Sequence, residues 1–279
     1  MPFLDEISYS RDGTIAAVRD YYQFITKMYL KETDIIEPPE DGWASLSTHL
    51  QCMGKTDEVL GLLSQLPYLQ SPSDIRDQAQ GAPWCEFVDW RAQAALVENG
   101  KIDGDKLRML SEGLPGLEYR DDIPPYVVGL TMGSGDLNPT FLLDTQHGIV
   151  TWYGITEEMR ESAVTVADPV DDDPYDYAAS EREAEWRAEG HSWAIADFFT
   201  VLKSKFSDLD WVPLGRHRVI DVYTIMHPSS DGVIPMLREI YHSYGWPDLE
   251  NYRKYECLQR VQAALEEHYP DLADRREDS

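Results

Sequence analysis

The stretch from residue 126 to residue 153, YVVGLTMGSGDLNPTFLLDTQHGIVTWY, constrains the fold more than any other part of the chain. It contains three short apolar runs whose residues suit a pleated, half-buried surface: Tyr126–Leu130, Thr140–Leu143 and Ile149–Tyr153. Segments rich in Gly and Asp separate the runs, and these residues favour tight turns. The pattern predicts an antiparallel meander of three strands.

Apolar residues at helical spacing lie on both sides of this meander. The first predicted helix begins near Thr14 or Asp12, either of which can cap it. Another is predicted from about Trp193 to Phe206, with Ser192 as its cap, and two more follow toward the C-terminus. Helices before and after a block of strands predict an α+β fold. We expect a curved antiparallel or mixed sheet with a central meander, packed by N- and C-terminal helices.

The chain of 279 residues is long enough for one large domain. We predict a flexible arm over residues 1–13, a single α+β domain over 14–268 and a charged tail over 269–279. Within the domain, residues 168–189 form an acidic insertion.

Three segments are predicted in more detail. Residues 168–176 hold five aspartates and two prolines, a composition expected to resist both helix and strand. Residues 84–90 alternate enough to predict a strand, whereas residues 98–125 are rich in Gly, Asp and Pro and lead into the central meander.

The formal net charge of -27 limits the classes of partner. Such a field repels nucleic-acid phosphate and anionic lipid, so neither nucleic acid nor a membrane is an expected partner. It favours a protein with a basic surface. The three cysteines, Cys52, Cys85 and Cys257, are far apart, and the N-terminal residues do not resemble a signal peptide. These features predict a cytoplasmic protein, and they leave the oligomeric state open.

Motifs that carry chemistry are not found. The histidines form neither HxH nor HExxH, and GxSxG does not occur. The Gly133–Gly135 turn is followed by Asp136 and a strand, not by the helix that a phosphate-binding loop requires. We therefore predict no catalytic residue, cofactor or metal. Asp136 and Asp144 lie at strand ends, where sites often form, although such residues also form turns.

Tryptophan residues recur in both the helical and the extended segments. Aromatic side chains dominate cores, and they also dominate pockets and interfaces. The residues predicted to line a partner surface or a pocket are Trp43, Trp84, Trp90, Trp152 and Trp193, together with Asp136 and Asp144.

The order of these segments resembles the SUKH superfamily, in its uncharacterised fungal branch. The resemblance is carried by Val127–Leu130, Phe141–Asp144, Gly148–Trp152 and, after the acidic insertion, Ser192–Phe199. It implies an α+β fold with a curved sheet and a role without catalysis. That role is a scaffold or regulator in fungi and a toxin-neutralising immunity protein in bacteria.

Two main hypotheses for the function remain at this point. The first is a non-catalytic intracellular interaction or scaffold protein that binds a basic partner, with an immunity-type inhibitor as a variant. The second is a small-molecule binder or biosynthetic enzyme with an aromatic pocket at the sheet. A closed cavity of several hundred Å³ holding a carboxylate or histidine would distinguish the second from the first.

Overall fold

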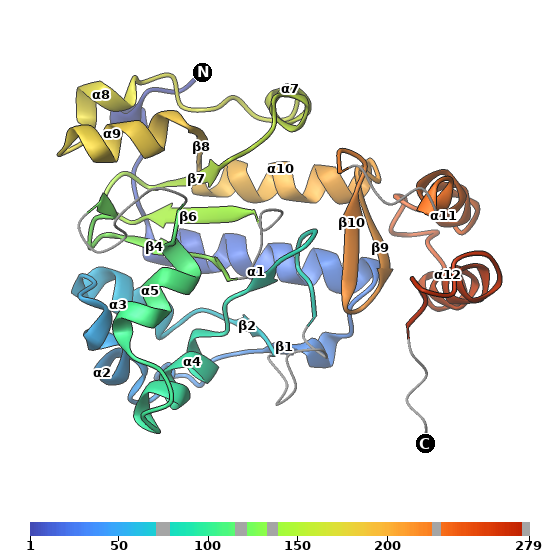
Figure 1. Cartoon of the computed structure of the whole chain (residues 1–279), viewed down its shortest axis with the longest axis horizontal. Coiled ribbons are helices and arrows are strands. Elements are labelled where there is room, and N and C mark those ends of the chain that lie inside the picture. Colours follow the sequence, from blue (N-terminus) through green and yellow to red (C-terminus); the bar gives the residue numbers. More distant parts are fainter. Residues whose placement is uncertain (71–78, 115–121, 133–138, 225–229, 275–279) are drawn as a thin grey trace.

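A four-stranded antiparallel sheet lies where the sequence predicts the meander, and it has the strand order β4-β6-β7-β8 (Figure 1). Its strands are β4 Val127–Gly129, β6 Thr140–Asp144, β7 Ile149–Tyr153 and β8 Gly190–Ala194. The computed structural model describes residues 1–70, 79–114, 122–132, 139–224 and 230–274. The mixed α+β class is confirmed.

Three two-stranded antiparallel sheets accompany this main sheet. They pair β1 Ile35–Ile36 with β2 Tyr68–Leu69, β3 Glu86–Phe87 with β5 Thr131–Met132, and β9 Trp211–Gly215 with β10 Arg218–Asp221.

Helices lie before and after the main sheet along the chain, and α7, α8 and α9 lie between its strands β7 and β8. The α-helices are α1 Arg11–Met28, α2 Leu46–Leu50, α3 Asp57–Leu63, α4 Trp90–Glu98, α5 Gly104–Glu112, α7 Glu157–Val164, α8 Pro174–Tyr177, α9 Glu181–Ala188, α10 Ile195–Ser207, α11 Val233–Ser243 and α12 Lys254–His268. Short 3-10 turns cover Leu4–Glu6, Glu32–Asp34 and Gln51–Met53. None of the helices in the described parts of the chain is long and apolar enough to cross a bilayer.

The two faces of the main sheet bury different partners because side chains alternate along each strand. Phe141 and Trp152 point to the face covered by α1 and α10, in the large core. Val127 and Leu142 point to the other face, where they join Trp186 of α9 in a smaller cluster. The second face is the one that holds the charged site described below.

Two predicted helix caps are wrong. The hydroxyl of Ser10, not Thr14 or Asp12, caps α1 by accepting a hydrogen bond of 3.1 Å from the Gly13 amide. Ser192 lies within β8, where its hydroxyl is 2.7 Å from that of Thr151. The segment before α10 is therefore a fourth strand of the sheet, and the helix begins at Ile195.

Aspartate caps explain where the other local predictions fail. Asp89 accepts from the Ala92 amide and begins α4, so the strand predicted over 84–90 is reduced to Glu86–Phe87. Asp103 likewise caps α5, a helix that the sequence analysis did not predict in the segment rich in Gly, Asp and Pro. Asp173 and Pro174 begin the short helix α8, so residues 168–176 do not wholly resist helix.

The N-terminal arm follows a defined path along the acidic insertion. The Leu4 amide donates to Asp172 Oδ2 at 2.7 Å, and the Asp171 amide donates to the Pro2 carbonyl at 3.0 Å. Gly148, at the turn between β6 and β7, has a φ of +72°, and a Cβ there would lie 2.9 Å from the Tyr9 nitrogen. The arm thus contacts both the insertion and the central hairpin.

Candidate functional site

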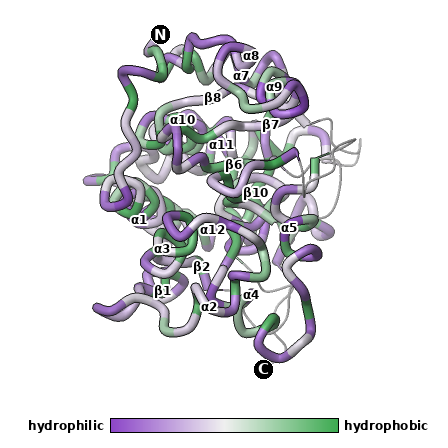
Figure 2. Tube along the Cα trace, turned by 90° about the vertical axis from the view of Figure 1, so that its left-hand side faces the viewer, coloured by the Kyte–Doolittle hydropathy of each residue, from purple (hydrophilic) through white to green (hydrophobic). Residues whose placement is uncertain are grey.

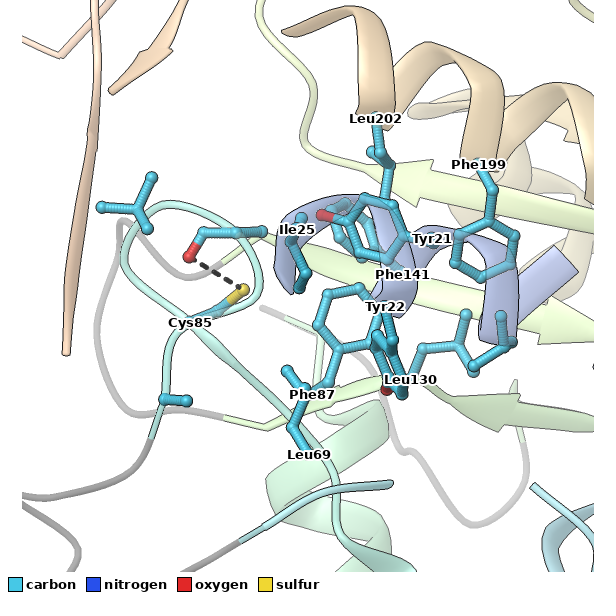
Figure 3. Close-up of a cluster of buried hydrophobic side chains, with 14 of the residues drawn as sticks. Tyr21, Tyr22, Ile25, Leu69, Cys85, Phe87, Leu130, Phe141, Phe199 and Leu202 are labelled. Carbon is cyan, nitrogen blue, oxygen red and sulfur yellow. Dashed lines mark hydrogen bonds between the residues drawn. The ribbon is translucent and has the colours of Figure 1, made fainter. Parts of the chain in front are cut away.

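Three of the five candidate tryptophans are core residues rather than surface residues. Trp90, Trp152 and Trp193 are 1, 3 and 0% exposed. The Trp152 ring lies 5.1 Å from that of Phe141, and Figure 3 shows Phe141 in the same core beside Tyr21. A space beside Trp90, lined also by Phe87 and Phe199, measures only about 10 Å³, which is at the lower limit for one water molecule. The space beside Trp90 is therefore too small for a ligand.

The two remaining tryptophans, Trp43 and Trp84, are half-buried, and their indole groups bind different parts of the chain. The Trp43 indole donates to the Leu66 carbonyl at 2.9 Å, while the Trp84 indole donates to Asp221 at 2.6 Å. Both indole N–H groups are thus satisfied within the chain. The candidate Asp136 lies outside the described residues.

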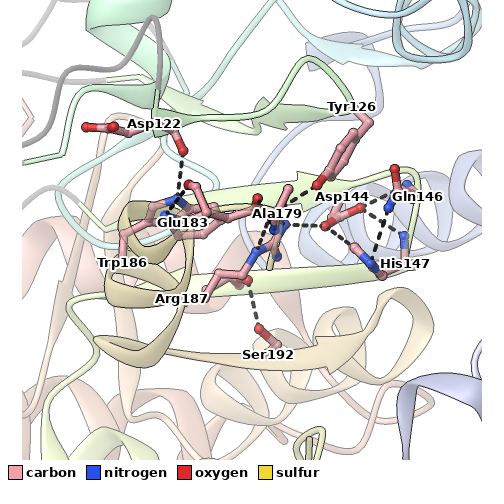
Figure 4. Close-up of polar contacts among 12 residues, drawn as sticks. Asp122, Tyr126, Asp144, Gln146, His147, Ala179, Glu183, Trp186, Arg187 and Ser192 are labelled. Atoms are coloured by element: carbon pink, nitrogen blue, oxygen red, sulfur yellow. Dashed lines mark hydrogen bonds and ion pairs between the residues drawn. The ribbon is translucent and has the colours of Figure 1, made fainter. Parts of the chain in front are cut away.

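Asp144 is the candidate around which charged groups converge (Figure 4). It ends β6 and is fully buried. One carboxylate oxygen, Oδ1, accepts from the backbone amides of Gln146 and His147 at 2.8 and 2.9 Å, which shapes the hairpin turn. The other, Oδ2, lies 2.8 Å from His147 Nδ1 and 2.6 Å from Arg187 Nη2.

Arg187 comes from α9, which covers the same face of the sheet, and completes the cluster. Its side chain is fully buried, and its Nε donates to Glu183 Oε1 at 2.9 Å, one turn earlier in the same helix. The Tyr126 hydroxyl donates to the same Glu183 oxygen at 3.1 Å. The guanidinium also lies 4.5 Å from the ring centre of Trp186. One cation is thus shared by two buried carboxylates.

The pKa shifts of this cluster follow from its geometry. Burial alone would raise the pKa of Asp144, but the His147 hydrogen bond and the Arg187 charge outweigh it, so the pKa is lowered. Burial, with the Glu183 carboxylate, raises the pKa of Tyr126 to about 12. At neutral pH the cluster therefore holds an ionised Asp144 beside a neutral tyrosine.

The cluster fastens α9 to the sheet. Both ring nitrogens of His147 have a neighbour in the hairpin, since Nδ1 contacts Asp144 and Nε2 lies 3.4 Å from the side-chain amide nitrogen of Gln146. Sequence reasoning identified Asp144 but missed Glu183 and Arg187. The available signal was their i, i+4 spacing on a helix that also carries Trp186.

A second buried ion pair lies below the same face of the sheet. Lys55 Nζ donates to Glu112 Oε2 and to the Val127 carbonyl, both at 2.7 Å, and neither charged side chain is exposed. Arg108 Nε adds a second contact to Glu112 at 3.2 Å. Desolvation lowers the pKa of Lys55 to about 8 despite the nearby Glu112.

Glu86 provides a prediction about pH. Burial raises its pKa from 4.5 to about 7, so the folded chain binds more protons than the unfolded chain between these values. The contribution of Glu86 to stability is therefore present below pH 4.5 and is lost as the pH rises through 7. Because the side chain is partly exposed, we expect Glu86→Gln to stabilise the fold at pH 8 by less than about 1 kcal/mol.

Urea denaturation of wild type and Glu86→Gln at pH 4.5 and pH 8 measures this difference. The two proteins should be closely matched at the lower pH. An equal gain in stability at both pH values would contradict the assignment.

The surface of α7–α9 is rich in exposed acidic residues, and we name residues 157–189 the acidic cap. Its exposed acidic residues are Glu157, Glu158, Glu161, Asp168, Asp171, Asp173, Asp176, Glu181 and Glu189. Its three arginines are all engaged: Arg160 with Glu157, Arg182 with Glu185, and Arg187 inside the cluster. Hydrophilic residues accordingly follow α8 and α9 in Figure 2. The cap presents negative charge that its own cations do not neutralise.

The described residues hold no group of three or more His, Cys, Asp or Glu side chains placed to bind a metal ion. No family model, curated protein or solved structure matches this chain.

Proposed function

We propose that this chain is a non-catalytic intracellular protein that binds a basic protein partner through the acidic cap. The observation that carries the proposal is the set of exposed carboxylates on the cap, beside arginines that are already paired or buried. Complementary charge of this kind steers a partner and raises the association rate more than the affinity.

Exposed aromatic rings on the same part of the molecule supply apolar contacts for such a partner. Tyr175 of α8 is 58% exposed, and Phe3 of the arm, which runs beside the cap, is 49% exposed. Aromatic anchors inside a polar rim are typical of protein interfaces. The N-terminus and α8 lie at the same end of the molecule (Figure 1).

The proposal agrees with the role that the SUKH resemblance implies, including its immunity-type variant, in which the partner is a toxin. The alternative, an enzyme or small-molecule binder, requires an aromatic pocket at the sheet. The packing of Trp152 and Trp193 in the core gives that alternative no support.

A matched pair of charge variants tests the proposal. Asp171→Asn, Asp173→Asn and Asp176→Asn, combined in one chain, remove three exposed charges from the cap. We expect this variant to lose at least about ten-fold in association rate with a partner recovered by cross-linking at low salt. Stopped-flow or surface-based kinetics at two salt concentrations measure the change.

The control removes three exposed charges elsewhere, with Glu40→Gln, Asp41→Asn and Glu239→Gln in one chain. It has the same net charge as the cap variant and should bind almost as wild type does. Equal losses of association rate in the two variants would show that net charge, and not the acidic cap, determines binding. Recovery of no partner at either salt concentration would contradict the proposal itself.

A further inference from the structure

Helix α7 of the acidic cap is attached to the rest of the molecule less firmly than α9. In α7, all of which is described, Ala163 is the one buried residue, whereas α9 buries four. Its polar attachments are long. The Ser162 hydroxyl donates to Asp210 Oδ2 at 3.2 Å, and Lys205 Nζ donates to the Met159 carbonyl at 3.3 Å. A helix held mainly by such contacts opens locally at a low cost in free energy.

A further attachment, between Arg160 of α7 and His191 of β8, depends on the charge of the imidazole ring. Arg160 Nη1 lies 3.2 Å from His191 Nε2. Because a guanidinium only donates hydrogen bonds, Nε2 must be the acceptor, and the neutral ring carries its proton on Nδ1. Protonation of Nε2 would replace this acceptor by a donor and bring two cations into contact. The attachment therefore exists only while His191 is neutral.

The surroundings of His191 do not compensate a positive charge on the ring. In the described parts of the chain, the charged groups that face it are Arg160 and, behind it, Glu157, which pairs with Arg160. Its neighbours on the sheet are neutral: Trp152 is its partner in the ladder, and the Trp193 ring centre lies 6.3 Å from that of His191. A proton on the ring is thus opposed by the adjacent cation.

The direction of the pKa shift agrees with this geometry. Burial and the Arg160 charge lower the pKa of His191 from its usual 6.5, and a hydrogen bond with the Gly190 backbone offsets only part of the shift. The contribution of His191 to the attachment of α7 is therefore fully present above pH 6.5. It is lost as the pH falls below that value, through the lowered pKa of the attached state.

We propose that protonation of His191 releases α7 from the sheet, so that this part of the acidic cap is closed at neutral pH and opens at acid pH. The released helix carries Glu157, Glu158 and Glu161, which are exposed acids of the cap. A basic partner should then bind less well at acid pH, a consequence that rests on the proposed function. The opening itself is a property of the chain alone.

Hydrogen exchange at about pH 7.5 and about pH 5.5, on either side of the usual histidine pKa, measures the opening without a partner. We expect the protection of residues 157–164, corrected for the intrinsic exchange rate, to fall about five-fold at the lower pH, as for the loss of one hydrogen bond. Protection of α12 Lys254–His268 should change little, which separates local opening from unfolding. NMR of the imidazole ring gives the titration midpoint of His191.

Two variants assign the effect to this pair. In Arg160→Met the midpoint of His191 should rise, and the protection of α7 should no longer depend on pH. Arg182→Met, a matched change in the same cap, should leave both as in wild type, because Arg182 pairs with Glu185. His191→Gln keeps an acceptor for Arg160 that does not titrate, so α7 should stay protected at both pH values.

The control for the histidine variant is His49→Gln, at a residue of α2 that faces Glu98, and it should behave as wild type does. Equal protection of α7 at both pH values in wild type would overturn the proposal. A loss at acid pH that persists in both His191→Gln and Arg160→Met would overturn it too. Since no partner is present in these measurements, either result leaves the proposed binding function untouched.

Discussion

Replacing Arg187 by methionine is expected to destabilise the fold by about 3–5 kcal/mol, because it leaves Asp144 and Glu183 buried without their cation. Both carboxylates are nearly inaccessible to water, so neither recovers the lost interaction by hydration. The methionine keeps much of the apolar volume of the arginine stem, so the loss reports mainly on charge. Equilibrium unfolding in urea gives the change in free energy.

Arg182→Met is the matched control on the same helix. Arg182 pairs with Glu185, but both side chains are exposed, so its loss should cost less than about 1 kcal/mol. Adding Asp144→Asn and Glu183→Gln to Arg187→Met should restore part of the stability, since neutral side chains no longer need the cation. Similar losses for Arg182 and Arg187 would show that the buried cluster contributes no more than a surface pair.

Lys55→Met is expected to cost about 3 kcal/mol, because among the described residues Glu112 then keeps only the partly exposed Arg108 as a cation, and the Val127 carbonyl loses its donor. The double variant Lys55→Met, Glu112→Leu should be more stable than the single variant, because it removes the stranded carboxylate. Lys203→Met, which breaks the exposed pair with Asp20, is the control and should change stability little.

The pH dependence of Lys55→Met distinguishes a charge effect from a packing effect. The pKa of Lys55 is about 8 in the fold against 10.5 for the free side chain, so the unfolded chain binds more protons between these values. This group's contribution to stability is fully present above pH 10.5 and is lost as the pH falls through 8. The difference between wild type and Lys55→Met should therefore widen from pH 8 to pH 10. A constant difference would indicate that packing dominates.

The central meander is readable from sequence because its three strands have apolar runs separated by turn residues. The strand β8 is not, because Gly190–Ala194 has no strong alternation and its register comes from pairing with β7. Likewise α5 is hidden among Gly and Asp residues until Asp103 is seen to cap it. Local composition does not predict an element whose formation depends on a capping residue, as in α5, or on pairing with a neighbouring strand, as in β8.

The candidate site could likewise be predicted from the sequence only where neighbouring residues determine it, and not where contacts between distant segments do. Asp144 stands out in the sequence as a turn residue at a strand end, but its ion pair with Arg187 spans 43 positions in the chain. Sequence spacing relates Glu183 to Arg187 within one helix, yet it does not place that helix on the sheet. The burial of Trp90, Trp152 and Trp193 also depends on which face of each element meets α1 and α10, which composition does not reveal.

The acidic cap leaves the sheet and returns to it at a single point. Tyr153 ends β7, Gly190 begins β8, and the two residues are direct partners in the ladder. Excising the whole excursion and joining these ends by a two-residue reverse turn would therefore preserve the hairpin register. In such a shortened chain Asp144 would lose Arg187 but would also be exposed to water, so it would not remain as a buried, unpaired charge. The deletion would therefore separate the sheet and its helices from the acidic cap.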